Sequence, residues 1–278
     1  MKKIMGIEYG RAATATITNA GPALGPGAVR KMFPTHPWIS VIPDEFNLAE
    51  CMADRFGENF KIQTKIYNAT PNERHIMIGG DHSVNFGHFA AIADQFPDED
   101  ICLVYIDAHL DMHTPETSRA EASGAPHGTN VRALLGDGDE RWLSLQHRKP
   151  ALRPENLFYL ASRSYEPAEI QNVRDKGIYI RHANELSDMD STQQIIDEIR
   201  QRLGNRKFVV SLDFDAIDPR HFSDVLVPEP NGIGLDIVTQ LVTAFSDAYS
   251  FEFVEYAPTG HEPSAQIAQD LITIALNK

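Results

Sequence analysis

The stretch that decides the fold reads Ile-Asp-Ala-His-Leu-Asp-Met-His and spans residues 106–113. It follows the apolar run 101–105, so we expect a buried strand to end where these polar side chains begin. Because side chains alternate between the two faces of an extended chain, Asp107, His109 and Asp111 would share one face. Three such groups at the end of a buried strand are costly unless a positive charge lies among them. A divalent metal ion is the simplest such charge.

Composition and charge narrow the class of protein. The chain has 278 residues, enough to bury a large core, and no linker, repeat or shift in composition divides it. We therefore expect one domain over 1–278.

The formal net charge of −14 argues against nucleic acid or a membrane surface as a partner and suits a small cationic ligand. Two cysteines make no disulfide framework, and we see no signal peptide or transmembrane-length run, so we expect a cytoplasmic protein.

Apolar runs alternate with amphipathic stretches along the whole chain. Strands are expected at 4–7, 38–42, 74–78, 101–106, 157–161, 178–180, 208–212 and 251–255, and helices at 28–32, 46–56, 84–95, 167–175, 192–203, 235–244 and 265–276. This alternation is typical of an α/β fold with a doubly wound parallel sheet. In such sheets ligands bind beyond the carboxyl ends of the strands, which is where the Asp and His clusters fall. The long polar loop that ends near residue 130 is expected to be functional.

Three clusters of metal-ligand side chains follow three separate apolar runs. His82 follows the run 74–78, the stretch 106–113 follows the second, and Asp213 with Asp215 follows 208–212. Together they offer two imidazoles and four carboxylates, which would balance two divalent cations. These nitrogen and oxygen donors favour Mn²⁺, Mg²⁺ or Fe²⁺, and the histidines leave Zn²⁺ open. Alone, His82 could be a turn residue and the aspartate pair a polar strand end, but three clusters at three strand ends favour a metal centre.

At this point a family resemblance becomes specific. The strings GGDHS (79–83), DAHLD (107–111) and SLDFDAIDP (211–219) resemble, in order and spacing, the three signatures of the ureohydrolase family, which includes arginase and agmatinase. The similarity covers most of the chain. It implies a three-layer α/β/α sandwich around a mostly parallel sheet and a cofactor of two Mn²⁺ per subunit. The metal ligands that it implies are His82, Asp107, His109, Asp111, Asp213 and Asp215.

The loop after Asp111 resembles that of arginase more than that of agmatinase, in HTPETS (113–118) and SGAPHGT (123–129). The resemblance implies that Ser123 helps to hold the amino-acid end of the substrate and that His127 is a proton shuttle. Glu255 matches the family glutamate that pairs with a guanidinium, whose planar donors suit a carboxylate. Glu166 stands in place of an aspartate that contacts the substrate amino group. A solvated loop histidine and a capped strand end are the simpler alternatives for His127 and Glu255.

Several positions depart from the arginase pattern. His113 replaces an asparagine that holds the substrate carboxylate, and residues 119–122 lengthen the loop. Ser164 replaces an acidic residue, and Asn231 follows the Pro-Glu-Pro segment where glycine is usual. These departures leave the implied metal ligands intact and leave the substrate open, although His113 remains a candidate substrate-binding residue.

The resulting hypothesis is a manganese-dependent amidinohydrolase that uses a metal-bridging hydroxide, with hydrolysis of L-arginine to L-ornithine and urea as the first candidate. Asp111 would orient the hydroxide and accept its proton, His127 would relay a proton to the leaving amine, and Glu255 would anchor the guanidinium. Agmatine, a guanidino acid and formimidoylglutamate are alternative substrates. A non-catalytic binding or regulatory relative and a metal-dependent deacetylase are alternatives from other classes. The resemblance also implies a homo-oligomer, a trimer or hexamer.

Overall fold

The computed structural model describes residues 1–13, 21–121 and 124–277. Within these ranges eight strands form one sheet in the order β2-β1-β3-β8-β7-β4-β5-β6, and every neighbouring pair is parallel. The strands are β1 (Lys3–Ile7), β2 (Trp38–Val41), β3 (His75–Ile78), β4 (Cys102–Ile106), β5 (Leu157–Ser162), β6 (Tyr179–His182), β7 (Phe208–Asp213) and β8 (Ser250–Val254). The predicted parallel sheet is confirmed, and it is parallel throughout.

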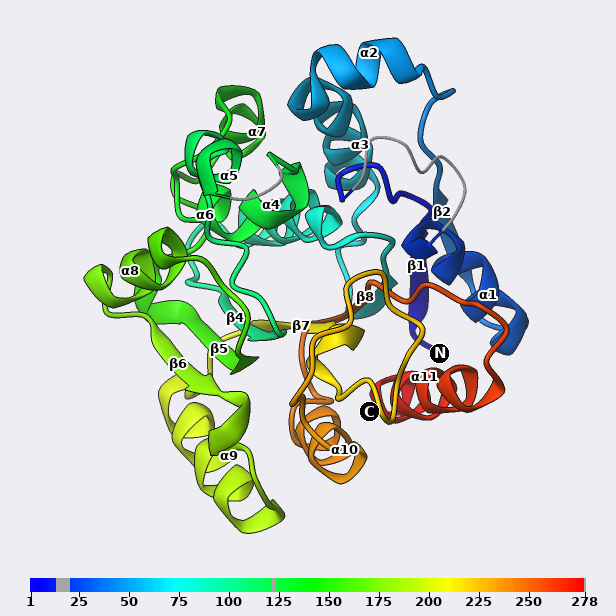
Figure 1. The fold of residues 1–278 in the computed structure, drawn as a ribbon, viewed down its shortest axis with the longest axis vertical. Coiled ribbons are helices and arrows are strands. Elements are labelled where there is room, and N and C mark those ends of the chain that lie inside the picture. Colours follow the sequence, from blue (N-terminus) through cyan, green and yellow to red (C-terminus); the bar gives the residue numbers. More distant parts are fainter. Residues whose placement is uncertain (14–20, 122–123, 278) are drawn as a thin grey trace.

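Helices cover both faces of the sheet (Figure 1). One layer contains α1 (Gly25–Met32), α9 (Met189–Leu203), α10 (Leu235–Ala244) and α11 (Glu262–Leu276). The other contains α3 (Arg55–Ala69), α4 (Asn85–Gln95), α6 (Asn130–Leu134), α7 (Glu140–Leu145) and α8 (Pro167–Asp175). The expected α/β/α sandwich is therefore confirmed. None of the helices in the described ranges has the length and apolar character needed to cross a membrane.

Apolar cores separate the sheet from its helix layers, and strand β4 shows how the sequence builds two of them. Cys102, Val104 and Ile106 point into the core shared with α9, α10 and α11. Leu103 and Tyr105 point into the opposite core, shared with α4 and α6. Because both faces of the strand are covered, nearly every position must be apolar. This double burial is the reason that the strands can be predicted from uninterrupted apolar runs.

The four central strands carry most of the candidate metal ligands, and Glu255, at or after their carboxyl ends. Strands β3, β8, β7 and β4 are consecutive in the sheet. Their registers pair Ile78 and Leu212 with Phe253, and Ile106 with Leu212, so the four strands end at nearly the same level. His82, Glu255, Asp213 and Asp107 follow or end these strands in that order. The parallel sheet therefore brings together side chains that lie up to 173 residues apart in the chain.

The prediction of one helix over 46–56 is wrong. Helix α2 (Leu48–Ala53) ends at Asp54, whose extended backbone has a φ of −151°, and α3 begins at the next residue. Asp54 caps α3 by accepting a hydrogen bond from the backbone amide of Gly57. Most of α3 escapes prediction because its buried face carries Asn59 and Gln63, which hydrogen-bond to Ser83 and so break the apolar period. The predicted polar loop also contains the short helix α5 (Pro115–Glu121).

A buried chain of polar side chains joins β3, α4 and β8 away from the candidate site. The Nε2 atoms of His75 and His88 lie 2.6 Å apart, and Nδ1 of His88 lies 2.5 Å from Oε1 of Glu252. Asn85 donates to the second oxygen of Glu252 at 2.6 Å. Burial, and secondarily the charge of His88, lowers the pKa of His75 to about 3. His75 is therefore neutral in the folded protein at ordinary pH.

Acidification is expected to lower the free energy of unfolding because His75 stays neutral in the folded protein. An unfolded histidine takes up a proton near pH 6.5, whereas folded His75 has a pKa of about 3, so the unfolded state binds more protons below pH 6.5. The free energy of unfolding should therefore fall by up to about 1.4 kcal/mol per pH unit from pH 6.5 towards 3. Urea unfolding at pH 7.5 and 5.5 should show a loss about 1.4 kcal/mol larger in the wild type than in His75→Gln.

A matched control for this measurement is His147→Gln, because the side chain of His147 is 80% exposed. This variant should lose as much stability between the two pH values as the wild type does. Equal losses in the wild type and in His75→Gln would show that His75 does not carry the pH dependence.

Candidate metal centre and substrate cavity

Asp107 is the residue around which the candidate centre is arranged. It follows β4 directly, and its backbone amide donates to the carbonyl of Leu160 on β5. Its Oδ2 lies 2.8 Å from Nδ1 of His82, and its Oδ1 lies 3.4 Å from Nδ1 of His109. The two oxygens of one buried carboxylate thus face two different imidazoles. Asp107 belongs to two of the three groups of potential metal ligands among the described residues, one with His82 and Asp111 and one with His109 and Asp215.

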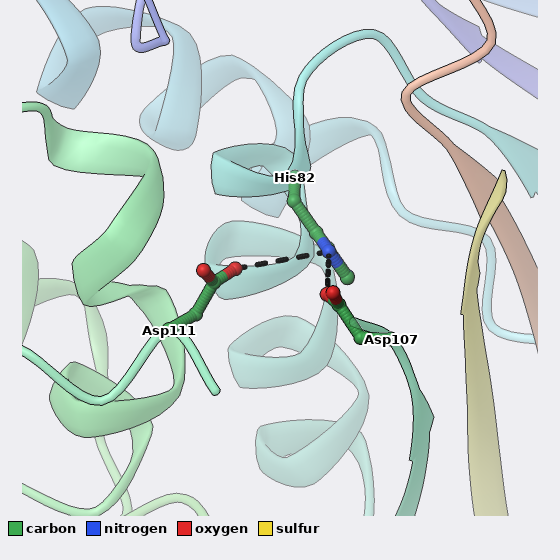
Figure 2. A group of neighbouring side chains, drawn as sticks. All are labelled: His82, Asp107 and Asp111. Atoms are coloured by element: carbon green, nitrogen blue, oxygen red, sulfur yellow. Dashed lines mark ion pairs between the residues drawn. The ribbon is translucent and has the colours of Figure 1, made fainter. Parts of the chain in front are cut away.

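His82 lies among three carboxylates, two from the segment after β4 and one from the end of β7. It begins the short 3-10 helix His82–Val84, and Figure 2 shows its ring directed between Asp107 and Asp111. Besides Asp107, its Nδ1 lies 3.1 Å from Oδ2 of Asp213 and 3.7 Å from Oδ2 of Asp111. Its Nε2 lies 2.9 Å from the hydroxyl of Ser211. When Nε2 carries the ring proton and donates it to Ser211, the lone pair of Nδ1 faces the lone pairs of carboxylate oxygens. A cation placed between Nδ1 and these oxygens would be bound by both.

The second group is more open to solvent. The side chain of His109 is 29% exposed, and its Nδ1 lies 3.1 Å from Oδ2 of Asp215. Oδ1 of Asp215 accepts a hydrogen bond from the amide of Ala108 at 3.2 Å, which ties the ends of β4 and β7 together. On the far side of the ring, Nε2 of His109 lies 3.6 Å from Oε1 of Glu229. Both sides of this imidazole therefore face carboxylates.

The raised pKa values of two carboxyl groups in the cluster indicate that it needs positive charge. Burial raises the pKa of Asp111 to about 7, and the charge of Asp107 adds to the rise. Burial also raises the pKa of Asp213 well above its usual value, with a further contribution from Asp215. Four carboxylates this close cannot all ionise without a counter-charge. Two imidazoles and four carboxylates, with no thiolate, form a donor set that fits two divalent cations with a preference for oxygen and nitrogen ligands.

Three residues that support this cluster were missed by sequence reasoning. Tyr105 stacks on the ring of His82, with 4.5 Å between the ring centroids, and donates to Oδ2 of Asp111 at 2.6 Å. Asn130 donates to the carbonyl of His82 at 2.7 Å, and Ser211 contacts its Nε2. A signal for two of them exists in the sequence. Tyr105 and Ser211 are polar residues within apolar strands, each two positions before a candidate ligand and so on the same strand face.

Glu255 and His127, the other predicted catalytic residues, line the same pocket as the six candidate ligands. Glu255 has a positive φ of 63° directly after β8, where its amide donates to the carbonyl of Gly80. Its Oε1 accepts a hydrogen bond from the amide of His82 at 2.8 Å, and burial raises its pKa well above the usual value. His127 has a buried Nδ1 with no hydrogen-bond partner among the described residues. Both side chains therefore lie beside the candidate ligands in one pocket.

A larger cavity of about 550 Å³ opens outward from this pocket, and we call it the outer cavity. Two of the three predicted substrate-binding residues, His113 and Glu166, line it. The ring of His113 is buried between neighbours, with Nδ1 3.0 Å from the hydroxyl of Thr117 and Nε2 3.1 Å from Oε2 of Glu166. The third, Ser123, lies outside the described residues. Glu169, which sequence reasoning did not single out, also lines the cavity.

Known proteins are similar to this chain over most of its length. The model of the arginase family matches residues 4–276. The arginase of Bacillus subtilis is 29% identical over 205 residues, which cover 72% of this chain and 67% of that protein. The arginase of Entamoeba histolytica is 30% identical over 193 residues, which cover 66% of this chain and 62% of that protein.

Solved structures share the fold over the whole chain. The crystal structure of Entamoeba histolytica arginase in complex with L-ornithine has a TM-score of 0.84 at 22% identity, and the match covers 100% of both chains. The crystal structure of formimidoylglutamase from Bacillus subtilis has a TM-score of 0.76 at 18% identity, covering 100% of this chain and 87% of that one. The same fold thus occurs in proteins named for two different substrates.

Proposed function

The chain belongs to the arginase family, and from that premise we propose that it hydrolyses the guanidinium group of a small substrate at a two-metal centre and releases urea. L-Arginine, with L-ornithine as the second product, is the first substrate that we expect it to accept. The observation that carries the proposal is the position of Asp107, whose two oxygens face two separate imidazoles. A carboxylate so placed can serve two cations at once. Glu255, in the same pocket, offers the negative charge that a guanidinium needs.

The residues that would hold the cations are those already grouped by geometry. His82 and Asp111 would hold one cation, His109 and Asp215 the other, and Asp107 both, with Asp213 adjoining His82. We choose Mn²⁺ because the family resemblance implies it, and nitrogen and oxygen donors without a thiolate suit this ion among others. When bound, two such ions neutralise the carboxylates and supply a hydroxide nucleophile at neutral pH.

The protein's own groups would then position the substrate and move protons. Glu255 would hold the guanidinium by paired, charge-assisted hydrogen bonds, which fixes its central carbon over the cluster. Asp111 would accept the proton of the nucleophile, because its carboxylate lines the same pocket. His127 lines the same pocket and would relay that proton from Asp111 to the leaving amine. The products are urea and the free amine.

A substrate panel tests this proposal. Protein loaded with Mn²⁺ should release urea from L-arginine or another guanidino compound, and the same protein treated with a chelator should release none. Urea is measured colorimetrically, and formamide is measured in parallel because formimidoylglutamate would yield formamide instead. Release of formamide alone would reassign the substrate, and the absence of any product from the metal-loaded protein would support a binding or regulatory role.

A further inference from the structure

The four candidate carboxylate ligands are held in two different ways. Three of them accept hydrogen bonds from backbone amides, at 2.6–3.2 Å, and these are Asp107, Asp213 and Asp215. A backbone amide is present whatever side chain its residue carries, so the orientation of these three depends on the main chain. The fourth is Asp111. Among the described residues its carboxylate accepts a hydrogen bond from one group alone, the hydroxyl of Tyr105, at 2.6 Å.

Asp111 also depends on its neighbours for its backbone conformation. It has a positive φ of 50°, in the left-handed region, which costs an aspartate more than a glycine and persists where surrounding contacts hold it. The backbone amide of Arg132, on α6, donates to the carbonyl of Asp111 at 3.3 Å and so restrains the main chain. This contact leaves the side-chain torsions free. The direction of the carboxylate is therefore set by the hydroxyl of Tyr105.

Tyr105 is itself held firmly enough to set that direction. It is fully buried, and its ring contacts two other rings. It stacks on His82, with 4.5 Å between the centroids and 8° between the planes, and meets Tyr159 edge-on at 5.5 Å. Asn130 donates to the hydroxyl of Tyr105 at 3.3 Å and to the carbonyl of His82 at 2.7 Å. With one lone pair of the hydroxyl occupied in this way, its single proton is donated to Asp111.

The contacts of Tyr105 belong to one of the two candidate cation groups. Its ring stacks on His82, its hydroxyl oxygen lies 3.1 Å from Nδ1 of His82, and the same hydroxyl holds Asp111. His82 and Asp111 are in the same group of potential ligands. The hydrogen bonds and ring contacts that the structure describes for Tyr105 include none to His109 or Asp215, which belong to the other group. Removing the hydroxyl should therefore affect one cation more than the other.

We infer that Tyr105 is a positioning residue that holds Asp111 for one of the two cations and thereby sets the affinity of the protein for that cation alone. The inference rests on the two-metal centre of the proposed function. A group that hydrogen-bonds to a metal ligand fixes the ligand before the metal binds, and its removal typically lowers metal affinity about 10- to 100-fold. The hydroxyl of Tyr105 is such a group for Asp111. The other three carboxylates keep their backbone amides when this hydroxyl is removed.

Titration of the chelator-treated, full-length protein with Mn²⁺ tests the inference. Calorimetry gives the dissociation constants, and electron paramagnetic resonance of the free ion checks them at each step. The wild type should bind two Mn²⁺ per chain.

Tyr105→Phe is the decisive variant, because it keeps the ring that stacks on His82 and removes the oxygen alone. It should raise the Kd of one Mn²⁺ by about 10- to 100-fold and leave the Kd of the other within a few-fold of the wild-type value. Two unchanged values of Kd, or an equal rise in both, would overturn the inference.

Tyr159→Phe is the matched control. Tyr159 is also fully buried, and its hydroxyl also donates at 2.6 Å, but to the backbone carbonyl of Leu110 rather than to a carboxylate. Both variants lose one buried hydrogen bond, so both should lower the Tm of the metal-free protein by similar amounts. Tyr159→Phe should keep both values of Kd. An equal weakening of the same cation in the two variants would assign the effect to packing near Asp111 and overturn the inference.

The same measurements separate failure of the inference from failure of the proposed function. If the Mn²⁺-loaded wild type releases no urea, the proposed function fails, and the titration of Tyr105→Phe still supports or overturns the inference. If the wild type releases urea and Tyr105→Phe keeps both values of Kd, the inference fails and the proposed function stands. A wild type that binds no second Mn²⁺ would overturn both.

Discussion

Asp213→Ala is expected to abolish both metal binding and turnover. Oδ2 of Asp213 lies 3.1 Å from Nδ1 of His82, and its Oδ1 accepts a hydrogen bond from the amide of Asp215 at 2.8 Å. The substitution would therefore remove one candidate ligand and also release the turn that places a second. We expect fewer than one metal ion per chain by elemental analysis, and a fall in kcat/KM for urea release of at least about 10³-fold.

A matched control lies in the same motif. Asp218→Asn changes an aspartate whose Oδ1 accepts hydrogen bonds from the backbone amide and the side chain of Arg220, outside the candidate ligand set. It should keep its metal. Added Mn²⁺ should raise the Tm of the wild type and of Asp218→Asn, because a ligand that binds the folded state stabilises it, and should not raise that of Asp213→Ala. Full metal content and activity in Asp213→Ala would refute the cluster assignment.

Much of the candidate centre was predictable because strand ends are marked in the sequence. Asp107 and Asp213 each end a run of apolar residues that the two covered faces of the sheet require. A parallel sheet collects such ends at one edge, so residues after different strands can be grouped without knowing the strand order. That grouping is what the structure shows for His82, Asp107 and Asp213.

What escaped prediction depends on neighbours that are distant in sequence. The insertion of β8 between β3 and β7, which brings Glu255 to the amide of His82, follows from packing rather than from any local pattern. The ring of His113 is oriented by Glu166, 53 residues away. Helix α3 is stabilised by buried amide side chains that make it look polar. Each of these features depends on contacts between residues that are distant in the sequence, and a local sequence pattern does not reveal such contacts.

Glu255→Gln is expected to lower kcat/KM for urea release by about 10²- to 10³-fold, because loss of one charge from a buried ion pair costs about 2–5 kcal/mol. The side-chain oxygen of glutamine can still accept the hydrogen bond from the amide of His82, so the 2.8 Å contact that holds this segment should persist. Metal content should stay at the wild-type level. The measurements are urea kinetics and elemental analysis on the same preparation.

The metal content decides between two roles for Glu255. Its carboxylate faces the pocket, where it would hold a guanidinium, but it also contacts the backbone of His82 and could act by positioning that ligand. Loss of activity with the metal retained assigns it to the substrate, whereas loss of both assigns it to His82. Glu262→Gln, at the exposed start of α11, is the control that should change neither quantity. Because Asp213→Ala is expected to lose both, the two variants together separate holding the metal from holding the guanidinium.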